Sequence, residues 1–347
     1  MKFIKIITVI ITFCSIAFCN MDRINALGGN AGFWPEDDAN ILKFPAMVNN
    51  VDMIQVSGAG NASGEAMIIW GEDTTWGFYF DGTDADNNNW FNLIWGDGNY
   101  GLLVGLSSAS EQDEEIEGFE TNTSSFGLEM GFGMNMNLGE IGVLFVMANE
   151  DDGVDNTDDP KASGLMLNFR KTQNVWLFKN MLTSFEMING TQGDELLNQK
   201  QVTVDLFTTL PTIDGVNATF AMGFGFWNET YNSGNDGAED RISSKITLPR
   251  VHLGVEADVT DWAKVRFGLN HEYVISGKDG DDYTWTGAGD ENGVSNFSWN
   301  FGLGFDYGTF TLDMVLENTA LFNDPVRYIT GRNDEALSSS ATLTWSF

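Results

Sequence analysis

The chain has few of the residues on which disulfides, nucleophilic catalysis and nucleic-acid binding depend. It contains two cysteines, two histidines and 17 basic residues against 50 acidic ones. The cysteines are Cys14 and Cys19, so a chain cleaved after Cys19 would have no disulfide, no thiolate metal site and no cysteine nucleophile. The excess of acidic residues excludes binding to the phosphates of nucleic acids, which requires a basic surface.

Prolines are scarce, and long apolar runs are absent after residue 20. No stretch there approaches the roughly 20 consecutive apolar residues that a transmembrane helix needs. The chain has only 6 Pro, but it contains 26 Phe, 11 Trp and 39 Gly. Such a composition is typical of strands that alternate between an apolar exterior and an interior of small or polar residues.

The beginning of the chain has the organisation of a secretory signal peptide. Lys2 and Lys5 precede the apolar run 6–18, and small residues occupy the two positions that a signal peptidase recognises. We expect residues 1–19 to be removed on export, which would leave 15 of the 17 basic residues beside all 50 acidic ones. A lipoprotein acylated at Cys19 would instead need a small residue just before the cysteine, where the sequence has Phe.

Alternation of apolar and polar residues predicts β-strands along the remaining chain. It is clearest in segment 337–347, where Leu343, Trp345 and Phe347 alternate with polar residues. A terminal Phe on such a strand resembles the signature by which bacterial outer-membrane barrels are recognised for assembly. In a soluble sandwich the glycines between the aromatic residues would face water, whereas a lipid exterior explains both faces of each strand.

The spacing of these segments predicts an antiparallel up-and-down transmembrane β-barrel over residues 51–347. Short turns alternate with long loops, as they do in outer-membrane barrels, so the strand number is even and both ends lie in the periplasm. We count 16 strands, with 14 as the alternative. Pro249 lies inside one of these strands and predicts a bulge there. The predicted strands are 51–57, 64–70, 75–81, 89–95, 100–108, 123–136, 140–148, 162–172, 175–187, 199–210, 215–230, 242–259, 262–276, 294–307, 309–322 and 337–347.

Residues 20–50, before the first strand, do not alternate. They contain three short motifs: Arg23 to Ala31 (RINALGGNA), Asp37-Asp38-Ala39 and Phe44-Pro45-Ala46. These motifs resemble the N-terminal region of the FadL-type long-chain fatty-acid transporter family and of related secretion-system barrels, although that family has Asn where Phe44 stands. The resemblance covers about 30 residues and implies that the segment is a hatch inside the barrel, with Asp37, Asp38, Phe44 and Pro45 as hatch residues. The alternative is a periplasmic lead-in without function.

Parity along the strands places charged residues on the inward faces. Because charges are tolerated only beside water or partners, these residues either pair across the wall or form rings that select among ions. The lumen-lining candidates are Lys264, Arg266, Glu272, Glu256, Asp258, Asp313 and Glu317.

Catalysis has little support in the sequence. His252 and His271 are the only histidines, and parity places His252 toward the lumen and His271 outward. They therefore cannot form a shared site, and no nucleophile–base pair is apparent. We expect a protein that is not an enzyme.

Acidic residues gather in the predicted external loops. Asp84 and Asp86 have the spacing of alternate oxygen ligands in a calcium loop, but the glycine and the closing glutamate of such a loop are absent. The sequence favours a solvated, self-repelling loop surface with no bound cofactor, and weak Ca²⁺ binding is the alternative.

The sequence therefore predicts a porin-like channel in the bacterial outer membrane that passes small solutes. One alternative is a hydrophobic-solute transporter with an N-terminal hatch and an apolar pocket near Phe33, Trp34, Ile41, Leu42 and Phe44. Another is a barrel that docks secreted or surface proteins. Expected partners are outer-membrane lipid and lipopolysaccharide, the barrel assembly machinery and a small-molecule solute; the sequence leaves a homo-oligomer open.

Overall fold

The computed structural model describes residues 21–58, 64–82, 89–116, 119–151, 159–234, 240–279, 283–286, 295–316 and 338–347. The predicted signal peptide 1–19, the candidates Asp84, Asp86 and Glu317, and most of the acidic loop residues lie outside these ranges. None of the helices in the described ranges is long and apolar enough to cross a membrane.

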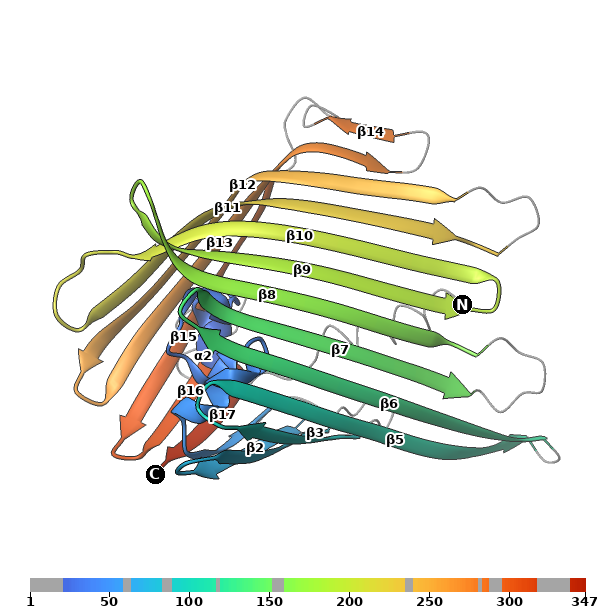
Figure 1. Ribbon diagram of the computed structural model, residues 1–347, viewed down its shortest axis with the longest axis horizontal. Coiled ribbons are helices and arrows are strands. Elements are labelled where there is room, and N and C mark those ends of the chain that lie inside the picture. Colours follow the sequence, from blue (N-terminus) through green and yellow to red (C-terminus); the bar gives the residue numbers. More distant parts are fainter. Residues whose placement is uncertain are drawn as a thin grey trace, which may run out of the picture.

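One antiparallel sheet forms nearly the whole described structure (Figure 1). A short helix and three 3-10 turns precede it: α2 (Met21–Ala26), η1 (Ala31–Phe33), η2 (Asp38–Asn40) and η3 (Pro45–Asn50). The strands are β1 (Met53–Ser57), β2 (Gly64–Gly71), β3 (Thr75–Gly82), β4 (Asn89–Gly96), β5 (Tyr100–Ile116), β6 (Phe119–Met136), β7 (Gly139–Asp151), β8 (Lys161–Val175), β9 (Phe178–Gln192), β10 (Glu195–Thr209), β11 (Val216–Asn232), β12 (Arg241–Thr260), β13 (Ala263–Asp279), β14 (Tyr283–Thr286), β15 (Ser295–Tyr307), β16 (Phe310–Leu316) and β17 (Ser338–Ser346).

Pairing between neighbouring strands closes the sheet into a ring. Apart from the short β14, each strand pairs with the next along the chain, and β1 pairs with both β2 and β17. The short β14 pairs only with β13 among the described strands, while β13 continues to β15, so 16 strands form the barrel. The predicted count of 16 is confirmed, and the alternative of 14 is wrong.

Strand ends differ from the prediction on the side of the long loops. Segment 109–122 was predicted to be a loop, but β5 and β6 continue to Ile116 and Phe119 and pair with each other there. Strands β9 and β10 likewise continue to a short connection between Gln192 and Glu195. Backbone pairing does not require apolar side chains, so a strand can continue into water where alternation ends.

The predicted bulge at Pro249 is present in β12. Thr247 and Arg250 have paired residues on both β11 and β13, but Leu248 and Pro249 between them have none. The register of β12 therefore shifts at this point. Proline has no backbone N–H to donate to a neighbouring strand, so it is accommodated where the ladder is interrupted. The shift changes the parity of the strand and turns Arg250 inward.

The outer face of the barrel is apolar, as alternation predicted. Large side chains such as Phe91, Val104, Met130 and Phe224 are exposed on it. Stacked aromatic pairs, such as Phe310 with Trp345, occur on the same face close to the short turns. An apolar outer band on a closed sheet is the arrangement that lipid requires, because every backbone polar group is paired within the ring.

Residues 21–50 lie inside the ring, close to its short-turn end (Figure 1). Local contacts give the segment its shape: the Asn30 side chain caps η1, the Asp37 side chain caps η2, and Pro45 begins η3. Gly28 and Gly29 have φ values of 102° and 84°, in the left-handed region that favours glycine, so the chain can turn sharply after α2. We call residues 21–50 the plug.

Candidate functional site

Glycines of the barrel wall make room for the backbone of the plug on two sides of the lumen. On β5, β6 and β7, a Cβ atom at Gly101, Gly133 or Gly142 would lie 2.2, 2.3 or 1.9 Å from the plug backbone at residues 43–46. On β13, a Cβ atom at Gly268 would lie 2.1 Å from the backbone nitrogen of Gly28. Such distances are too short for non-bonded atoms, so these positions require glycine while the plug is in place.

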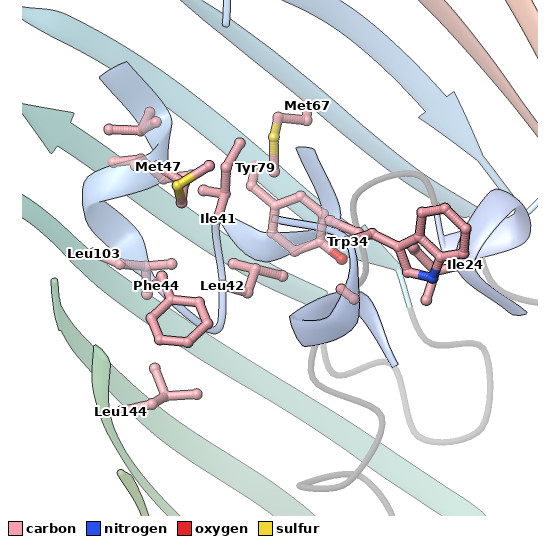
Figure 2. Close-up of a cluster of buried hydrophobic side chains, with 14 of the residues drawn as sticks. Ile24, Trp34, Ile41, Leu42, Phe44, Met47, Met67, Tyr79, Leu103 and Leu144 are labelled. Carbon is pink, nitrogen blue, oxygen red and sulfur yellow. The ribbon is translucent and has the colours of Figure 1, made fainter. Parts of the chain in front are cut away.

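An apolar cluster joins one side of the plug to the wall. Figure 2 shows Ile41, Leu42, Phe44 and Met47 of the plug packed among side chains from the inner face of the barrel. The wall side chains in this cluster include Met53, Met67, Ile69, Tyr79, Ile94, Leu103, Leu144 and Val146. From β1 to β7 the inner face therefore has apolar side chains among buried polar ones such as Gln55, Asn92 and Glu129, in contrast to the wholly polar interior that alternation predicted. An apolar inner face is stable here because the plug covers it.

Ion pairs join the opposite side of the plug to β12 and β13. Arg23 forms an ion pair with Asp37 within the plug, and its Nε donates to Glu256 Oε2 at 3.0 Å. Arg266 Nε donates to the same oxygen at 2.6 Å, and its Nη1 lies 2.6 Å from Asp313 Oδ1. Two guanidinium groups thus link three carboxylates across the boundary between the plug and the wall.

Burial changes the ionisation of the plug residues in this network. Burial alone would lower the pKa of Arg23, but the carboxylates of Asp37 and Glu256 raise it above its ordinary value. Burial raises the pKa of Asp38, and the neighbouring charges of Asp37 and Asp313 raise it further. Asp38 therefore favours its neutral form more than an exposed aspartate does, and Gln55 Nε2 donates to it at 3.2 Å.

A third guanidinium group, that of Arg170 on β8, holds the middle of the plug. Its Nη1 donates to the carbonyl oxygen of Gly32 at 3.2 Å and to Asn40 Oδ1 at 3.0 Å. Its carbon Cζ lies 4.5 Å from the centre of the Phe44 ring, and Glu140 accepts from its Nε. Arg170 is only 3% exposed, so a plug that moved away would leave a buried cation with fewer partners.

In the described part of the chain, a cavity lies on each side of the plug. The first, which we call the loop-side cavity, has a volume of about 500 Å³. Its charged lining is balanced, with two basic residues, Lys43 and Arg250, and two acidic residues, Asp205 and Glu272. The second, the turn-side cavity, has a volume of about 720 Å³. Its charged lining comprises three basic residues, Arg23, Lys264 and Arg266, and six acidic residues, Glu36, Asp37, Asp38, Glu256, Asp306 and Asp313.

The closed ring, its apolar outer band and its charged interior together decide the class of the fold. The chain has the fold of an outer-membrane β-barrel. No protein-family model and no curated protein matches it.

Several solved outer-membrane proteins are similar to this barrel. CdiB from Acinetobacter baumannii matches with a TM-score of 0.43 and 11% identity, over 85% of this chain and 59% of that one. The ferric citrate transporter FecA in its unliganded form matches with a TM-score of 0.41 and 10% identity, over 76% of this chain and 51% of that one. This barrel thus spans about half to three-fifths of those two proteins. A Pseudomonas aeruginosa FadL homologue matches with a TM-score of 0.31 and 10% identity, over 96% of this chain and 99% of that one.

The predicted lumen residues fall into separate groups in the barrel. Glu256, Arg266 and Asp313 are buried together in the network with Arg23. Lys264 pairs with Asp306 at 2.8 Å at the turn-side end, and Asp258 is exposed beyond it. Glu272 belongs to the loop-side cavity, where Arg250 Nε donates to it at 3.0 Å.

The predicted hatch residues lie on two different sides of the plug. Asp37 and Asp38 line the turn-side cavity. Phe44 is fully buried in the apolar cluster, and Pro45 lies against the glycines of β5 and β6. His252, on the inner face of β12, has its Nδ1 2.8 Å from Asn270 Oδ1. Asn270 Nδ2 donates to the carbonyl oxygen of Gly28 at 2.7 Å, so this pair of side chains fixes the turn of the plug.

Four cations of the site were missed as site residues by the sequence prediction. Arg23 and Lys43 lie in the plug, which has no strand period from which their direction could be derived. Arg250 follows the bulge that reverses parity, and Arg170 lies in a strand with no other charged residue on its inner face to draw attention to it. The plug is itself net acidic, with Asp22, Glu36, Asp37 and Asp38 beside these two cations, so its overall charge gave no signal for Arg23 or Lys43.

Proposed function

We propose that the protein is an outer-membrane channel for small polar solutes, and that the plug closes its lumen. The observation that carries this proposal is the position of the plug between the loop-side and turn-side cavities, with packing on two sides of the wall. A barrel of 16 strands is wide enough for an aqueous lumen once such a segment is displaced. Both cavities are lined by charged and polar side chains, which supports a water-soluble solute.

The charge of the turn-side cavity supports a preference for cations. Its lining has six acidic and three basic residues, so it has a net negative charge even with Asp38 neutral. Fixed charges of one sign around a pore raise the local concentration of the opposite ion and repel ions of the same sign. We therefore include selectivity for cations over anions in the proposed function.

A hydrophobic solute is less well supported. That function requires an apolar pocket near the plug, but Ile41, Leu42 and Phe44 are already packed against the inner wall. The two other aromatic residues of the predicted pocket, Phe33 and Trp34, line cavities whose remaining walls are largely polar. No catalytic step enters the proposal.

Recordings in planar lipid bilayers test the proposed function. The full-length barrel should be nearly silent, and a variant lacking residues 21–50 should conduct with a reversal potential that indicates cation selectivity. Heat-modifiable migration in gel electrophoresis should first establish that both proteins are folded. A folded deletion variant that does not conduct would overturn the proposal, and a conducting one that prefers anions would overturn the assigned selectivity.

A further inference from the structure

Among the residues that the structure describes, Phe33 alone lines both cavities. Phe33 ends η1 in the plug and is 4% exposed. Every other described residue of the two linings belongs to one cavity alone. The side chain therefore stands at the boundary between the two polar spaces.

On β12 and β13, the plug backbone and the Trp34 side chain fill the space between the cavities. Along β12, His252 lines the loop-side cavity and Glu256 the turn-side cavity, with Gly254 between them. A Cβ atom at Gly254 would lie 2.7 Å from Trp34 Cζ2 and 2.9 Å from the carbonyl oxygen of Leu27. On β13, Gly268 has the equivalent place and abuts the backbone of Gly28. The plug leaves no passage along this part of the wall.

Beside β10, aromatic rings rather than the plug backbone separate the two cavities. Asp205 lines the loop-side cavity and Thr209 the turn-side cavity, and Phe207, between them, is 1% exposed. The centre of the Phe33 ring lies 5.4 Å from that of Phe207 and 4.8 Å from that of His252. A single phenyl ring on the plug thus seals the gap against two rings of the wall.

We propose that Phe33 is the barrier residue of the channel, and that solutes pass between the cavities along β10 and β11 when its ring is displaced. The inference rests on the proposed function and identifies the residue at which the closed channel is blocked. An apolar constriction between two wet spaces blocks ions because water does not fill it. Removal of the ring would let water join the cavities while the ion pairs and glycine contacts keep the plug in place.

The substitution Phe33→Ala tests this in planar bilayers. Phe44→Ala is the matched control, because Phe44 is another fully buried aromatic residue of the plug but lines neither cavity. We expect Phe33→Ala to raise the conductance several-fold over that of the full-length protein, Phe44→Ala to raise it clearly less, because it can only loosen the plug, and Phe33→Trp to stay closed.

The outcomes separate the inference from the proposed function. Equal opening by Phe33→Ala and Phe44→Ala would show that any loosening of the plug suffices and would overturn the barrier role. A closed Phe33→Ala variant beside a conducting variant without residues 21–50 would overturn only the barrier role. If the deletion variant itself is silent, the proposed function fails and the inference fails with it. Phe33→Leu, a smaller change, repeats the test if Phe33→Ala does not fold.

Discussion

At the scale of the residue, Arg266 shows how the interior holds charge with little water. Its side chain is 2% exposed and contacts the carboxylates of Glu256 and Asp313, of which Asp313 is fully buried. We expect Arg266→Ala to lower the free energy of unfolding by about 3–5 kcal/mol, because it leaves two buried carboxylates without this cation. Urea unfolding in detergent micelles measures the change.

Lys264→Ala is the control for that substitution. Lys264 lies on the same strand and also pairs with a carboxylate, but its side chain is 30% exposed. An exposed pair contributes about 0–1 kcal/mol. Equal losses in the two variants would contradict the role assigned to burial in the network.

Lys43 gives a prediction for the dependence of stability on pH. Burial, aided by the positive charge of Arg170, lowers its pKa to about 8, while Asp205 and Glu186 oppose the shift. Between pH 8 and the ordinary pKa of 10.5, the unfolded chain binds more protons at this residue than the folded one, so stability rises with pH. Urea titrations at several pH values should show this rise, and Lys43→Met should reduce it. Parallel curves for both proteins would show that Lys43 is not the cause.

Alternation predicted the inward direction of Glu256, Arg266 and Asp313, since parity in a strand fixes the side of each residue. It could not show that Arg23 joins them. The contact between Arg23 and Glu256 links residues 233 positions apart and depends on the path of a segment without regular structure. Pairing of this kind is set by the whole barrel rather than by local sequence.

At the scale of the element, the wall glycines and the plug are complementary surfaces. A Cβ atom at Gly268 would collide with the backbone nitrogen of Gly28, which cannot rotate away as a side chain could. We expect Gly268→Ala to loosen the plug, raise the conductance and lower the free energy of unfolding by about 1–3 kcal/mol. Bilayer recordings and urea unfolding measure the two effects.

Gly64→Ala provides the comparison for this prediction. A Cβ atom at Gly64 on β2 would meet no atom within 4 Å. The conductance of that variant should match that of the unmodified protein. A closed, fully stable Gly268→Ala barrel would mean that the plug does not lie against β13.

The strands themselves were predictable, but the inner apolar wall was not. Alternation marks a strand with one apolar face, whereas β2 and β4 have apolar residues on both faces, as in Met67, Ile68 and Ile69. Such a run indicates burial on both sides. In a barrel the second buried side requires a covering segment, and the sequence does not say which segment covers it.

At the scale of the whole molecule, the outer band sets where charge can be placed. Val104 lies near the middle of the apolar part of β5 and is 46% exposed, while Tyr100 begins the strand and is 44% exposed. We expect Val104→Arg to destabilise the barrel in lipid vesicles by about 2–4 kcal/mol and Tyr100→Arg by about 0–1 kcal/mol. Unfolding titrations from the bilayer measure both values, and equal costs would place the membrane at a different height.

The number of strands could be predicted from the sequence because each strand has its own alternation of apolar and polar residues, and turn-forming residues separate one strand from the next. Closure was predicted as part of the barrel class, but no local pattern specified the pairing of β1 with β17, which joins residues at opposite ends of the chain. The plug and its contacts belong to the same class of long-range features. Local sequence thus predicted the parts of the barrel, and the enclosed space depended on their assembly.

The seam between β1 and β17 has a mechanical consequence. Its paired residues extend only from Met53 to Val56, whereas β12 and β13 pair over most of their length. Under heat or pulling force, a closed sheet is expected to open first between strands that share few backbone hydrogen bonds. The plug leads directly into β1 and is fastened to β17, where Thr342 Oγ1 donates to Asp22 Oδ2 at 2.6 Å. The plug, which we propose closes the lumen, therefore also links the two strands of this short seam.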